Sequence, residues 1–199
     1  MTALEAPGRL QGLDRMRGAA SLLMVADHGL VAASVGGWWR LGPTRAALPL
    51  FCLVAGALSG GPWERRRRRV VAMAVAGVGL TFTVWPVLGG GVPDVLLVLA
   101  LGFLVVAGLE RAGSPGLTVV VLSVASIQPV TWPVGTGYQL GTVVVLLLFG
   151  GLAGVRDLLE LAGNRLPAWV GVAGRRPLTV YVVHLGAMAG IVALTRVVG

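Results

Sequence analysis

The chain alternates between long apolar runs and short segments that carry most of its charged residues. A helix that crosses a membrane needs about 20 consecutive, mostly apolar residues. On this pattern we predict seven spans, at residues 17–36, 46–61, 70–88, 94–110, 117–134, 139–155 and 177–197. We therefore expect an all-α integral membrane protein, a bundle of about seven transmembrane helices that forms a single domain over residues 1–199.

Composition supports this fold class. Hydrophobic residues make up 56% of the chain and charged residues only 12%, whereas soluble domains carry about 25% charged residues. The formal charge of +8 could indicate nucleic-acid binding, but in a multi-pass protein it indicates basic cytoplasmic loops. We expect membrane lipids, and no nucleic acid, as partners. Cys52 is the sole cysteine, so an intramolecular disulfide is excluded, and we expect it to be a small core residue.

Glycines lie inside the apolar runs as well as between them. Two pairs at four-residue spacing, Gly56 with Gly60 and Gly150 with Gly154, fit the close approach of helices in a membrane. A bias in the composition of the whole sequence explains the same glycines equally well, so both interpretations stay open.

The distribution of arginine predicts the orientation. All 16 basic residues are arginine, and a cytoplasmic N-terminus places thirteen of them inside and three (Arg40, Arg45 and Arg196) outside. Positive charge is retained on the cytoplasmic side, which favours a cytoplasmic N-terminus. Because the number of predicted spans is odd, the C-terminus then lies outside. The run 65–69 is either a topology signal at anionic headgroups or a site for an anionic cytosolic ligand. The inner segment 156–176 could contain a short helix on the membrane surface.

Three ionisable side chains inside apolar runs are candidates for function, namely Asp27, His28 and His184, because such groups are costly in a bilayer. Eleven residues separate Arg17 from His28, which is about three turns and a rise of roughly 16 Å, so both lie on one helix face. Asp14 can pair with Arg17 three residues later. Asp27 points about 100° away from His28 and cannot easily orient it. A structural hydrogen bond to a neighbouring helix is the alternative role for either histidine.

The segment from Arg9 to His28 resembles the opening of the acyltransferase-3 superfamily of membrane proteins. It contains Leu-Asp14-x-x-Arg17-Gly, and His28 follows Arg17 after ten intervening residues. The spacing from Met24 to His28 is similar to that in the related heparan-alpha-glucosaminide N-acetyltransferase branch. This is the most specific of the resemblances in the chain.

Two further segments resemble the same superfamily in the expected order. Residues 49–56, Pro-Leu-Phe-Cys-Leu-Val-Ala-Gly, resemble its second helix, with Ala55 in place of the usual serine, and the basic run follows them. Residues 174–184 are similar to its closing helix, which has a Gly-x-x-Ser/Thr-x-x-x-Tyr-x-x-His character, with Tyr181 and His184 at the end. Family members usually contain more helices than the seven predicted here.

The resemblance implies transfer of an acyl group, most simply acetyl, from cytosolic acyl-CoA to a hydroxyl or amine acceptor. The acceptor would be a small molecule, a lipid or a glycan. His28 and Asp27 would be catalytic, with His28 acting either as general base or as acyl carrier, and Tyr181 and His184 would bind substrate. Basic side chains at the cytosolic rim would hold the phosphates of the donor. The candidate donor-binding residues are Asp14, Arg17, Arg65, Arg68, Arg175 and Arg176.

Other classes of function remain open. Asp27 could protonate an alkene in a membrane-bound prenyl or terpene cyclase, although the sequence lacks an aspartate-rich diphosphate motif. A transporter or structural subunit is the third class, disfavoured because no internal repeat is visible. The sequence also lacks zinc-ligand spacing, a phosphate loop and a dinucleotide fingerprint, so we expect acyl-CoA as a co-substrate, no bound metal and no tightly bound cofactor. All classes place the protein in a cell membrane, bacterial in type, as a multi-pass protein, and a homo-oligomer is compatible with each.

The predicted topology is tested with reporter fusions. A fusion after residue 199 should report an external location, and a fusion in the segment 62–69 should report a cytoplasmic one, because thirteen of the 16 arginines then lie inside. A cytoplasmic reporter after residue 199 would contradict the odd number of spans.

Overall fold

The computed structural model describes residues 10–32, 46–58, 63–88, 94–113 and 140–198. Within these ranges all regular structure is helical, which confirms the all-α class. The helices are α1 (Gln11–Ala32), α3 (Ala47–Ala57), α4 (Trp63–Thr83), α5 (Val95–Ala112), α7 (Leu140–Gly151), α8 (Ala153–Asn164), α9 (Val170–Arg175) and α10 (Pro177–Val198).

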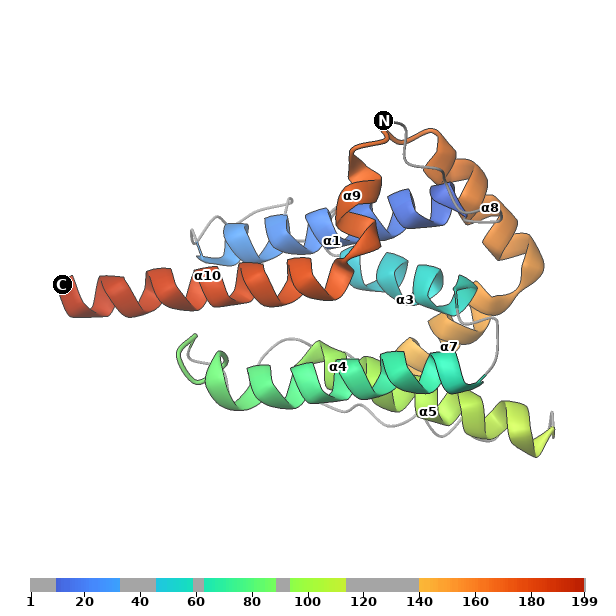
Figure 1. Ribbon diagram of the computed structural model, residues 1–199, viewed down its shortest axis with the longest axis horizontal. Helices are drawn as coiled ribbons and strands as arrows, with labels where there is room; N and C mark the ends of the chain where they lie inside the picture. The colour runs from blue at the N-terminus through green and yellow to red at the C-terminus, as the bar shows by residue number, and fades with distance from the viewer. Residues whose placement is uncertain (1–9, 33–45, 59–62, 89–93, 114–139, 199) are drawn as a thin grey trace.

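The helices pack in two groups that meet through α3 and α7. Figure 1 shows α1 beside α10 on one side and α4 beside α5 on the other, with α8 at one end and α9 packed across α1. Helix α7 contacts both α3 and α5, and α3 in turn contacts α1, so these contacts join the two groups. The core between them contains the fully or nearly fully buried side chains of Cys52, Leu99, Val143, Leu147 and Leu185. The burial of Cys52 confirms its predicted place in the core.

Two described helices, α5 and α10, are long and apolar enough to cross a membrane, and the bent pair α7–α8 makes a third if it counts as one span. Helix α3 has only 11 residues, too few to cross a bilayer by itself. Helices α1 and α4 have 22 and 21 residues. Each begins several residues before the corresponding predicted span, 17–36 or 70–88, and these first residues include charged side chains. The predicted span 117–134 lies outside the described residues.

The predicted span 139–155 breaks near its C-terminal end. Helix α7 ends at Gly151, and α8 leaves it at an angle of 84°. One side of α8 buries Leu159, while Leu158 and Leu161 on other sides are exposed. The short helix predicted between 156 and 176 is therefore present as α8, and its place on the membrane surface stays a prediction.

Side chains cap the beginnings of two helices, one from a segment distant in sequence and one locally. The carboxylate of Glu160 on α8 accepts hydrogen bonds from the backbone N–H groups of Gly12 and Leu13, at 2.9 and 2.7 Å, in the first turn of α1. These N–H groups have no partner within their own helix, so Glu160 stabilises the start of α1. At α5, the carboxylate of Asp94 accepts the N–H of Leu96 at 2.8 Å in the usual manner of an N-cap.

Glycines bring the backbones of α3 and α7 into contact. A Cβ atom on Gly56 would collide with the carbonyl oxygen of Leu147, and a Cβ on Gly150 would collide with a carbonyl oxygen of α3. The predicted packing role of these two glycines is confirmed. Gly154 has open space around its Cβ position, and Gly60 lies outside the described residues.

The α3–α7 contact is tested by a matched pair of substitutions. Gly56→Leu should destabilise the protein by about 1–3 kcal/mol, because the side chain must displace backbone and not a flexible side-chain end. Gly154→Leu, which meets open space, should leave the stability in detergent nearly unchanged. Equal midpoints of thermal unfolding for the two variants would show that the helices do not meet at Gly56.

Candidate functional site

The two histidines of the chain contact each other. Nδ1 of His28 on α1 lies 2.8 Å from Nε2 of His184 on α10, and the rings are stacked with their centroids 5.1 Å apart. Both side chains are partly buried. The sequence places them 156 residues apart, and the fold brings them together because α1 packs beside α10.

The hydrogen bonds of the pair determine where the protons lie when both rings are neutral. Nδ1 of His184 is 3.0 Å from the carbonyl oxygen of Val180, which can only accept, so this nitrogen carries the hydrogen. Nε2 of His184 is then an acceptor, and Nδ1 of His28 donates to it. It follows that Nε2 of His28 keeps its lone pair. A neutral imidazole held in this tautomer is suited to take a proton or attack an electrophile through Nε2.

A buried polar network continues from His184. The ring of Tyr181 meets the ring of His184 edge to face, with centroids 5.4 Å apart, and the Tyr181 hydroxyl donates to Oδ2 of Asp94 at 2.9 Å. The indole N–H of Trp85 donates to the same oxygen at 2.8 Å. The backbone N–H of Asp94 in turn donates to the hydroxyl of Thr81 at 3.0 Å. These bonds join α4, α5 and α10 around one fully buried carboxyl group.

Arg17 makes contacts within the helix bundle. Its Nε donates to the carbonyl oxygen of Gly174 at the end of α9, and its NH2 group donates to the carboxylate of Asp14 at 2.8 Å. The predicted pairing of Asp14 with Arg17 is confirmed. A Cβ atom on Gly174 would collide with the carbonyl oxygen of Asp14, so α1 and α9 touch at this point. Arg17 and His28 thus contact consecutive segments, α9 and α10, which is consistent with their predicted place on one helix face.

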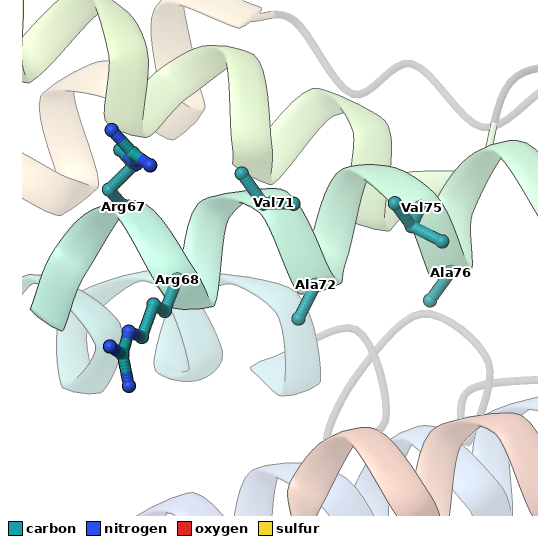
Figure 2. A pocket seen from close by; sticks show the side chains of 6 residues that line it. All are labelled: Arg67, Arg68, Val71, Ala72, Val75 and Ala76. Atoms are coloured by element: carbon teal, nitrogen blue, oxygen red, sulfur yellow. The ribbon is translucent and has the colours of Figure 1, made fainter. Parts of the chain in front are cut away.

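The arginines of the basic run have different surroundings. Arg66 pairs with Glu110 on α5 at 2.6 Å, and Arg69 donates to the carbonyl oxygen of Leu58 at 3.3 Å. Arg67 and Arg68 are exposed and point to opposite sides of α4, and an apolar strip follows them along that helix (Figure 2). The shallow hollow there is lined by Arg67, Arg68, Val71, Ala72, Val75 and Ala76.

The remaining predicted site residues lie apart from this hollow. Arg175, the last residue of α9, and Arg176, which lies between α9 and α10, are both exposed and follow the Gly174 carbonyl that Arg17 binds. Asp27 is partly buried on α1 next to His28. The side chain of Arg65 lies outside the described part of the structure. The fold therefore brings together His28, His184 and Tyr181, and places the exposed arginines elsewhere.

Asp94 was not among the site residues predicted from the sequence. It was assigned to the edge of a span, although it is the fully buried centre of the polar network. A usable signal was present, because an aspartate between Pro93 and a long apolar run is typical of a helix N-cap. The distant partners Trp85 and Tyr181 carry no such local signal.

Comparisons with known proteins give no family. No protein-family model matches the chain, and no curated protein or solved structure matches it either. Among the described residues, no group of three or more His, Cys, Asp and Glu side chains is arranged to hold a metal ion.

Proposed function

We propose that this chain is a multi-pass membrane acyltransferase that moves an acyl group, most simply acetyl, from acyl-CoA to a hydroxyl or amine acceptor. The observation that carries the proposal is the hydrogen-bonded pair of His28 and His184, which leaves Nε2 of His28 as a base. The motifs around these two histidines are the ones that resemble the acyltransferase-3 superfamily. The seven-span topology with a cytoplasmic N-terminus and an external C-terminus belongs to the same proposal.

The proposed reaction uses one base and one leaving group. Nε2 of His28 takes the proton from the hydroxyl or amine of the acceptor, whose oxygen or nitrogen attacks the thioester carbonyl carbon. A new C–O or C–N bond forms, the C–S bond breaks, and the coenzyme A thiolate leaves and accepts the proton. Nδ1–H of His28 stays hydrogen-bonded to His184, so the ring keeps its orientation when it becomes charged. In the variant route, Nε2 first attacks the thioester carbonyl carbon, a C–N bond forms and the C–S bond breaks with release of the coenzyme A thiolate. The acceptor then takes the acyl group from the imidazole, the C–N bond breaks, and the acceptor's proton passes to the thiolate.

Exposed arginines supply the proposed binding of the donor. Helices α1 and α4 begin at the same end of the molecule in Figure 1, and Arg67 and Arg68 lie in the first turns of α4. Their guanidinium groups suit the phosphates of coenzyme A, and the apolar strip from Val71 to Ala76 suits a thin chain that enters from that end. Arg17 already binds Gly174 and Asp14, so its proposed role is to hold α9 in place near the donor.

The proposal predicts the behaviour of two variants. His28→Ala should lower the rate of acyl transfer from acetyl-CoA by roughly 10²–10⁴-fold, because the base is lost, and should leave donor binding intact. Asp27→Asn should keep most of the activity, because the carboxyl group on the neighbouring helix face takes no part in the hydrogen bond between the rings. The measurement is the release of the coenzyme A thiol by purified protein in lipid nanodiscs.

The same two variants separate this function from the cyclase. A carboxylic acid must protonate the alkene in that reaction, so Asp27→Asn would be the inactive variant and His28→Ala would turn over normally. That result would replace the acyltransferase assignment by a proton-initiated cyclase. Calorimetry with acetyl-CoA provides the control, since His28→Ala should bind the donor with nearly the affinity of the wild type.

A further inference from the structure

Asp94 carries more hydrogen bonds than the cap of a helix requires. Its Oδ1 accepts the N–H of Leu96, which completes the N-cap of α5. Its Oδ2 accepts two more donors, the indole of Trp85 and the hydroxyl of Tyr181. A serine or an asparagine would cap α5 equally well, so capping alone does not account for the second oxygen. A fully buried carboxylate is costly unless donors such as these surround it.

The second oxygen of Asp94 fixes the position of Tyr181. The Tyr181 side chain is only 2% exposed, and its hydroxyl is held at 2.9 Å from Oδ2. Tyr181 and His184 are three residues apart on α10 and therefore lie on one face of the helix. Their rings meet at an angle of 75°, so the tyrosine ring forms one wall of the space in which the His184 ring can turn.

The orientation of His184 decides which nitrogen of His28 is free. Nδ1 of His184 donates to Val180 and its Nε2 accepts from His28 only in this rotamer. A rotation of the His184 ring would remove the acceptor from Nδ1 of His28. The hydrogen on His28 could then move to Nε2, the tautomer that neutral imidazole favours in water, and the base would be lost.

We infer that Asp94 is a positioning residue of the histidine pair, which acts through the Tyr181 hydroxyl to hold His184 and thereby keeps the hydrogen of His28 on Nδ1. The inference rests on the proposed function only in treating Nε2 of His28 as the working base. The arrangement itself can be observed without any acyl transfer.

Nitrogen NMR tests this inference directly, because the chain contains just two histidines. The full-length protein is labelled with ¹⁵N-histidine, carries an affinity tag without histidine, and is studied in lipid nanodiscs above the pH at which the rings are charged. The wild type should show both rings as the Nδ1–H tautomer. Tyr181→Phe, which keeps the ring and removes the hydroxyl, should lose the Nδ1–H signal of His28 in favour of Nε2–H or an average of the two.

Two more variants make the result specific. Asp94→Asn can still cap α5 but presents an amide NH₂ where Oδ2 accepted Tyr181, so it should change the histidine spectrum as Tyr181→Phe does. Trp85→Phe removes the other donor to Oδ2 and should leave the spectrum of the wild type. If Asp94→Asn does not fold, Tyr181→Phe decides the question by itself.

The results that overturn the inference are distinct from those that overturn the function. Unchanged tautomers in Tyr181→Phe, or a wild type that already shows His28 as Nε2–H, would exclude the positioning role of Asp94. The other outcome is that the wild type shows both rings as Nδ1–H and Tyr181→Phe shows the predicted change, but the protein releases no coenzyme A from acetyl-CoA. That outcome would support the inference and reject the acyltransferase.

Discussion

One hydrogen bond between two imidazole rings joins α1 to α10, and the chemistry proposed for this protein depends on it. The bond from His28 to His184 sets the tautomer of His28 and leaves Nε2 with its lone pair. A histidine alone in an apolar helix face could rotate or exchange its tautomer freely. Two histidines that satisfy each other, with Val180 as the final acceptor, form an ordered chain in which each nitrogen has a defined role.

The packing of the helices places this bond. Backbone contacts at glycines bring α1 against α9 and α3 against α7, and Glu160 fixes the start of α1 against α8. Arg17 then ties α1 to the end of α9, three residues before α10 begins, which sets where α10 runs along α1. The buried carboxyl group of Asp94 holds α10 from the other side, against α4 and α5. The histidine pair therefore lies between two sets of polar contacts.

Local patterns in the sequence predicted what depends on composition and spacing. The apolar runs predicted the helices, the eleven residues from Arg17 to His28 predicted their common face, and the Asp14–Arg17 pair followed from helical geometry. The contact of His28 with His184 could not be predicted, since it depends on how α1 and α10 pack. The break after Gly151 and the network of Asp94 escaped prediction for the same reason. Helix length escaped prediction as well: within the described residues, the apolar run of the predicted span 46–61 forms the 11-residue helix α3, which is too short to cross a bilayer by itself.

The central claim is that His28 and His184 work as one unit, and a kinetic double-mutant cycle tests it most directly. The rate of coenzyme A release from acetyl-CoA is measured for the wild type, the two single alanine variants and the double variant, all in the same nanodiscs. Residues that act as a unit give strongly non-additive losses, so the double variant should be no slower than His28→Ala alone. If the two losses multiply instead, the histidines act independently, and the hydrogen bond between them is not the basis of the activity.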